Sequence, residues 1–200
     1  MSDMRRDDIV WTVVITVIAV TINPVLKFVG LLPADVFKNL GIFYPGLPQI
    51  VFGPLMAFLL LLLFLKTGRP MVFPVIGFLR ALSLSFVFPA NLEHSGTLLA
   101  AIVAGGLAMM LLNKAEGRSS MWLPTLTGFY AGLYAACNYL TTFVFGPTAQ
   151  SQEIMAWPLP ALGVVIGSFV LGFVLGLLAC RLMRPLQAAV VAPLAPRFGL

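Results

Sequence analysis

Residues 47–65 read LPQIVFGPLMAFLLLLLFL, a run that contains no charged side chain. The run stops at Lys66-Thr67-Gly68-Arg69-Pro70. A helix crosses a bilayer with about 20 apolar residues, whereas a transmembrane β-strand shows about ten residues of alternating polarity. Because this run is continuous rather than alternating, it predicts a transmembrane helix and an all-α fold.

Similar apolar runs fill most of the remaining chain. The predicted spans are 9–32, 47–65, 71–88, 97–112, 121–145 and 159–183. Apolar residues make up 60% of the 200 residues and charged residues 10%, with a mean hydropathy of +1.02. Six spans use about 120 residues, which leaves no room for a soluble domain of roughly 50 residues or more. We therefore expect one polytopic helical bundle over residues 1–200. Pro74 and Arg80 interrupt the third run, so five spans and one re-entrant segment are the alternative.

The distribution of positive charge predicts the orientation of the bundle. Nine of the 12 basic residues lie at the termini and in alternate loops: Arg5, Arg6, Lys66, Arg69, Lys114, Arg118, Arg181, Arg184 and Arg197. The opposite connections carry only Lys38, with Lys27 near their edge. Since cytoplasmic loops are enriched in Lys and Arg, we expect both termini inside the cell and a multi-pass protein of the inner (plasma) membrane. The basic residues form no stripe with exposed aromatic residues, so no nucleic-acid partner is expected.

Small residues recur every four positions in three of the predicted spans. The rows are Ala100, Ala104 and Ala108; Gly128, Gly132 and Ala136; and Ser168, Gly172, Gly176 and Cys180. In lipid, close packing of small residues supplies much of the association between helices. We expect the rows to be internal contacts, with docking of a membrane partner as the alternative for one of them. Thr12, Thr16 and Ala19 form a weaker surface of this kind on the first span.

One charged residue, Arg80, lies in the middle of the third predicted span. An arginine at the centre of a membrane helix costs about 2.5 to 3.5 kcal/mol on insertion scales, so it should face the bundle interior or a wet cavity. Its guanidinium carries several N–H donors in one plane, and this geometry suits an anionic or carbonyl group of a ligand. The structural alternative is an arginine that snorkels or bonds to helix carbonyls.

Further polar residues approach the outer face from three separate spans. They are Asn23 and Lys27; Asn91, Glu93 and His94; and Asn138, Tyr139, Thr141 and Thr142. An apolar cavity with a few convergent polar groups is typical of a small-molecule site, and hydrated helix ends are the alternative. The predicted ligand contacts are Arg80, Asn91, Glu93, Asn138 and Tyr139. Glu93 suits a cationic ligand and Arg80 an anionic one, so these residues leave the compound open.

The sequence gives little support to catalysis. His94 is the only histidine, which excludes multi-histidine zinc sites and bis-histidine haem ligation within one chain. A hydrolytic triad could use only His94 beside Glu93, and no nucleophile elbow is present. The GxxxxGK[ST] phosphate-binding loop is also missing, so any ATPase must be a separate chain. We predict no enzymatic activity, no catalytic residue, no cofactor and no metal site.

The layout resembles a known family of membrane proteins. The strings that carry the likeness are Phe52-Gly53-Pro54-Leu55-Met56-Ala57, Leu65-Lys66-Thr67-Gly68-Arg69-Pro70 and Ala90-Asn91-Leu92-Glu93. Together with six spans, cytoplasmic termini and a long outer connection after the first span, they resemble the substrate-binding S-components of energy-coupling factor vitamin transporters. The order of the strings is similar to that of the hydroxymethylpyrimidine or thiamine branch.

The resemblance implies a binding protein and not an enzyme. Such a protein captures a small organic micronutrient from the outer face under a loop, here residues 31–48. It then associates with a transmembrane coupling protein and two ATPase subunits and topples in the membrane to release its cargo. Family members dock through an AxxxA pattern on the first span, where this chain has Thr12, Thr16 and Ala19. The alternative from another functional class is a non-transporting structural or assembly subunit of a membrane complex.

Overall fold

The computed structural model describes residues 6–29, 33–42, 44, 46–87, 93–113, 121–144 and 149–183. These residues form helices without any β-strand, which confirms the all-α class. Six of the helices are long and lie on the six apolar runs of the sequence: α1 (Arg6–Phe28), α3 (Gln49–Thr67), α4 (Val72–Val87), α5 (Glu93–Asn113), α6 (Trp122–Val144) and α8 (Pro158–Leu182). Two short helices, α2 (Pro33–Asn39) and α7 (Ala149–Ala156), lie where the sequence predicted connections.

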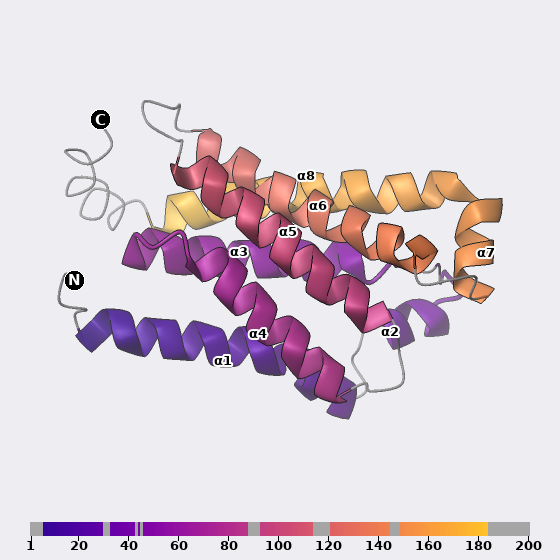
Figure 1. Cartoon of the computed structure of the whole chain (residues 1–200), viewed down its shortest axis with the longest axis horizontal. Coiled ribbons are helices and arrows are strands. Elements are labelled where there is room, and N and C mark those ends of the chain that lie inside the picture. The colour runs from indigo at the N-terminus through magenta and orange to yellow at the C-terminus, as the bar shows by residue number, and fades with distance from the viewer. Residues whose placement is uncertain are drawn as a thin grey trace.

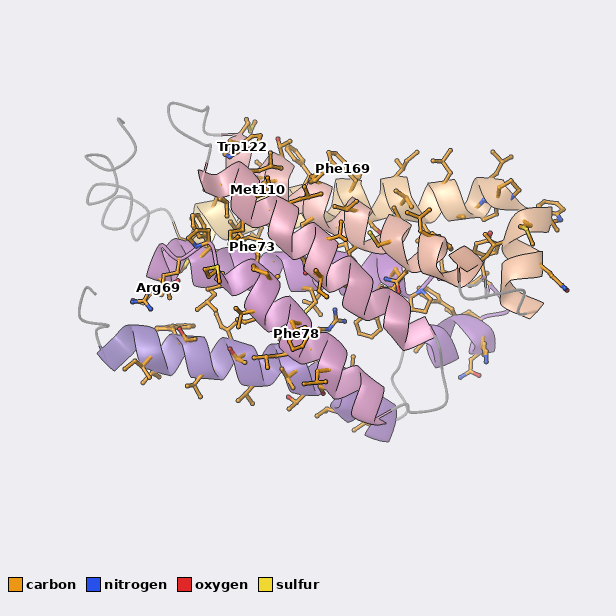
Figure 2. All side chains as sticks on the ribbon, viewed as in Figure 1. Arg69, Phe73, Phe78, Met110, Trp122 and Phe169 are labelled. Atoms are coloured by element: carbon orange, nitrogen blue, oxygen red, sulfur yellow. The ribbon has the colours of Figure 1, made fainter. Side chains whose placement is uncertain are left out.

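The six long helices run back and forth along one bundle (Figure 1). Helices α1, α4 and α6 run in one direction and α3, α5 and α8 run in the other, so α1 begins at the end of the bundle where α8 finishes. We call this the terminal end. The short helices α2 and α7 both lie at the opposite end. Arg69, between α3 and α4, lies at the terminal end (Figure 2).

Glycine and proline set the ends of the helices that frame the bundle. Gly68 caps the C-terminal end of α3. It has the left-handed backbone that glycine adopts without a Cβ clash, and it donates its N–H to the carbonyl oxygen of Phe64 at 2.7 Å. At the opposite end, α7 and α8 are separated by Trp157, whose backbone is not helical. Trp157 precedes Pro158, and the residue before a proline is disfavoured in the helical conformation. Pro158 then opens α8, where its missing N–H costs nothing.

The small-residue rows of α6 and α8 face each other in the most extensive helix contact of the bundle. A Cβ on Gly172 would lie 2.7 Å from the Cβ of Ala131 and 3.0 Å from the carbonyl oxygen of Thr127. A Cβ on Gly128 would lie 2.8 Å from the carbonyl oxygen of Phe169. The prediction that these rows are internal packing is therefore confirmed for α6 and α8.

The alanine row of α5 also points inward. Ala104 and Ala108 are fully buried, while the side chain of Ala100 lies outside the described residues. A Cβ on the neighbouring Gly105 would come within 2.7 Å of the Cα of Pro74, so α4 and α5 pack backbone to backbone. The row supplies a bundle contact rather than a free docking face.

Helix α1 contributes little to the core. Ile15 and Ala19 are buried, and Thr12 and Thr16 are half-buried. Ala19 has no exposed surface, so the alternative of a docking face on this helix draws no support from this residue. The hydroxyl of Ser83 on α4 donates to the carbonyl oxygen of Val20 at 3.1 Å, which ties α1 to α4.

Among the residues that the structure describes, two helices, α3 and α8, are long and apolar enough to cross a membrane. Helix α4 has 16 residues and is therefore about 24 Å long, shorter than a hydrocarbon core of about 30 Å.

The outer face of α8 is apolar along its whole length, with these exposed side chains: Leu159, Leu162, Ile166, Phe169, Val170, Leu171, Val174, Leu178 and Leu182. Phe78 of α4 and Met110 of α5 are also exposed (Figure 2). A continuous apolar surface of this extent marks contact with lipid or with another protein.

Candidate functional site

Arg80 lies halfway along α4 and is 2% exposed. Its Nη1 donates a hydrogen bond to the hydroxyl oxygen of Tyr134 on α6 at 3.0 Å. The sequence-based expectation that Arg80 faces the bundle interior is therefore confirmed. Nε of Arg80 is also buried, and it has no hydrogen-bond partner.

Two aromatic rings flank the guanidinium. Its carbon lies 5.6 Å from the ring centroid of Phe52 on α3 and 5.5 Å from that of Tyr134. A cation at this distance is attracted by the negative face of an aromatic ring, and the attraction grows when the pair is removed from water. Three helices thus hold the arginine: α4 carries it, and α3 and α6 supply the rings.

Tyr130, one turn before Tyr134 on α6, continues the aromatic lining. The two tyrosine rings stack with centroids 6.2 Å apart, and Phe73 of α4 meets Tyr130 edge-on at 5.8 Å. Tyr130 has no exposed surface, and its hydroxyl has no hydrogen-bond partner. Most buried polar groups have a hydrogen-bond partner. Nε of Arg80 and the Tyr130 hydroxyl are therefore two buried groups whose hydrogen-bonding capacity is unused in this part of the bundle.

Phe52, Tyr130 and Tyr134 were not among the predicted site residues. The four-residue spacing of Tyr130, Tyr134 and Asn138 places all three on one face of α6, which was a signal available in the sequence. It did not identify the partner of Arg80, because the rotation of α6 relative to α4 depends on packing.

Of the other predicted ligand contacts, Asn138 and Tyr139 have side chains that the structure describes. Asn138 donates from Nδ2 to the backbone carbonyl of Tyr134 at 2.9 Å, so Tyr134 is bonded to both Arg80 and Asn138. Asn91 lies outside the described residues. Glu93 is the first residue of α5, and its side chain lies outside the described part of the chain.

Tyr139 belongs to a different hydrophobic cluster from Tyr134, the hydrogen-bond partner of Arg80. It is buried with Ala135, Ile154 and Val164, and Tyr44, Leu47 and Ile50 are among the residues packed against them. The hydroxyl of Tyr44 donates to the carbonyl oxygen of Trp157 at 2.7 Å. These contacts place Tyr139 beside the segment before α3. The second cluster joins the segment before α3 to α6, α7 and α8.

Gly46 holds the segment before α3 against this second cluster. It has φ +78°, and a Cβ there would lie 2.7 Å from Cζ of Tyr139. We expect Gly46→Ala to lower the free energy of unfolding by about 1 to 2 kcal/mol, because it adds both backbone strain and a clash. Gly41→Ala is the matched control, since Gly41 has φ +70° but open space around its Cβ. Thermal unfolding in detergent measures both variants, and equal losses would show that the Tyr139 contact contributes nothing.

Removing the hydroxyl of Tyr130 should not harm the protein when no ligand is bound. Tyr130→Phe keeps the ring contacts with Phe73 and Tyr134 and deletes a buried group that has no partner. An unsatisfied buried hydroxyl costs about 1 to 3 kcal/mol, so we expect the variant to unfold at the same temperature or a higher one. Tyr134→Phe provides the contrast, because it deletes a hydroxyl that accepts from Arg80 and should lower the unfolding temperature. A drop for Tyr130→Phe as large as that for Tyr134→Phe would contradict this assignment.

Within the described ranges, no three side chains of His, Cys, Asp or Glu lie close enough together to hold a metal ion. The chemistry that the described site offers is hydrogen-bond donation from a buried cation inside an aromatic lining. That chemistry suits the binding of an acceptor group.

Comparison of the chain with protein-family models, with curated proteins and with solved structures gives no match in any of the three.

Proposed function

We propose that this chain crosses the cell membrane six times, with both termini in the cytoplasm. Helices α3 and α8 have the length and composition of membrane spans, and α1 and α8 turn long apolar faces outward. The alternating directions of the six long helices are those that six crossings require (Figure 1). Arg69 and Arg181 lie toward the terminal end and Lys38 toward the opposite end, which supports a cytoplasmic terminal end.

Within this bundle the function is capture of a small organic solute from the outer side for uptake into the cell. The observation that carries the proposal is Arg80, a buried guanidinium held between two aromatic rings with an unpaired Nε. Ionisable residues inside membrane spans are expensive, and they commonly mark substrate pathways. A purely structural arginine would be expected to use all of its buried donors.

Transport requires an energy source, which we propose that separate subunits supply. Residues 1–200 contain no GxxxxGK[ST] phosphate-binding loop. The role is that of the S-components of energy-coupling factor transporters, which the sequence resembles. The expected partners are a transmembrane coupling protein and ATPase subunits, and the expected cargo is a vitamin or a vitamin precursor.

The alternative role, a permanent assembly subunit, draws less support from the bundle. Its docking surfaces would be the small-residue rows and the face of α1 that carries Ala19. Gly128 and Gly172 pack against each other's helices, and Ala19 is fully buried. These surfaces are used within the chain.

Mass spectrometry of small molecules released from the purified protein tests the proposal. We expect one water-soluble metabolite to be enriched with the wild-type protein and lost from Arg80→Met. Methionine fills a similar volume without charge, so the variant should remain folded, because replacing a buried charged group by an apolar one of similar size is often neutral. Size-exclusion chromatography and thermal unfolding check the fold. A metabolite retained by a folded Arg80→Met protein would contradict a ligand role for Arg80, and a wild-type protein that releases no metabolite would contradict the uptake role.

A further inference from the structure

The charge on Arg80 is not balanced by any acidic residue in the predicted spans. The seven acidic residues are Asp3, Asp7, Asp8, Asp35, Glu93, Glu116 and Glu153, and all of them lie outside the six predicted spans. In the described part of the chain, Arg80 makes one hydrogen bond, to a neutral tyrosine hydroxyl, and two contacts with aromatic rings. A buried charge is strongly unfavourable unless it is paired, so the membrane interior of this chain carries a cation that needs an anion.

The geometry of the guanidinium indicates which anion fits. Nη1 donates to Tyr134, and the buried Nε, which shares the other edge of the guanidinium with Nη2, has no hydrogen-bond partner. Two parallel N–H donors on one edge of a guanidinium match the two oxygens of a carboxylate. The unpaired hydroxyl of Tyr130 lies one helical turn from Tyr134 on the same face of α6 and can donate a further hydrogen bond.

We propose that the site takes a small organic carboxylate, bound through the Nε and Nη2 edge of Arg80 with the Tyr130 hydroxyl as an additional donor. This inference names the substrate class of the proposed function and rests on it. The ring of Phe52 and the stacked rings of Tyr130 and Tyr134 supply flat apolar surface for the rest of the molecule. A cationic ligand is disfavoured, because it would place a second positive charge beside Arg80 in a medium of low dielectric constant.

Three probes that share one ring and differ in charge test the proposal: benzoate, benzamide and benzylammonium. Each is added at the same concentration and ionic strength to the full chain in a neutral detergent, and the thermal unfolding midpoint is recorded. We expect benzoate to raise the midpoint, and benzamide and benzylammonium to leave it within error. Benzoate should lose its effect on Arg80→Met. Its apparent affinity for Tyr130→Phe should fall about threefold to tenfold, corresponding to a hydrogen bond of roughly 1 kcal/mol.

The outcomes separate this inference from the proposed function. No shift with benzoate, or an equal shift with benzamide or benzylammonium, overturns the carboxylate assignment. A released metabolite without an acid group also overturns it and leaves the uptake role standing. A benzoate shift that depends on Arg80, in a protein that releases no metabolite, supports the anion site and contradicts the uptake role.

Discussion

Gly172→Leu should separate α6 from α8 and abolish the folded bundle or leave it strongly destabilised. A Cβ at this position already meets Ala131 at 2.7 Å and the backbone of residues 127 and 128 at 3.0 and 3.1 Å. Backbone atoms cannot rotate away as a side-chain tip can, so the two helices must move apart. Overpacking of this kind costs typically 1 to 3 kcal/mol and occasionally more, and a leucine here should cost about 3 kcal/mol or more.

Gly163→Leu is the matched control on the same helix. Gly163 is exposed, and nothing lies within 4 Å of its Cβ position. Leucine favours a helix over glycine by roughly 0.5 to 1 kcal/mol, so this variant should be neutral or more stable. Yield of monodisperse protein and thermal unfolding in detergent measure both. Comparable losses at the two positions would mean that α6 and α8 do not pack as described.

Val170→Arg should prevent normal insertion of α8. Val170 lies at the centre of the helix and is 53% exposed on its apolar outer face. In water an arginine at such a position would be harmless, since exposed substitutions usually change stability by about 0.5 kcal/mol or less. At the centre of a membrane helix the cost is about 2.5 to 3.5 kcal/mol, which lowers the equilibrium constant for insertion by roughly 70- to 400-fold.

Leu182→Arg introduces the same side chain at the end of the same helix. Leu182 is 61% exposed and follows Arg181, so its guanidinium can reach the membrane surface. We expect normal membrane accumulation for this variant and loss for Val170→Arg, measured by immunoblotting of membrane fractions. Equal accumulation of the two variants would place the outer face of α8 in water or against protein instead of lipid.

The long helices could be predicted from the sequence because each lies on a long, largely apolar run. The short helices α2 and α7 could not, since seven or eight residues carry too little periodicity to separate them from a loop. The first predicted span extended to residue 32, whereas α1 ends at Phe28. Helix limits depend on capping and on local contacts that an apolar run does not encode.

The site was only partly predictable. The position of Arg80 could be predicted because a charged side chain within an apolar run has to face the bundle interior or a wet cavity. The partners of Arg80 could not, because the rotation of each helix about its axis is set by packing. A rotation of roughly 100° per residue also explains Tyr139: five positions beyond Tyr134, it leaves α6 on a different side and joins the second cluster.

The hydrogen bond from Tyr44 to the backbone of Trp157 has a mechanical consequence. It fastens the chain entering α3 to the chain entering α8, and α3, α6 and α8 also pack on one another along their lengths. We expect α3, α6 and α8 to move together as one rigid body. Under the proposed function, a solute that reaches Arg80 through a movement of α4 away from these three helices would break the hydrogen bond from Arg80 to Tyr134.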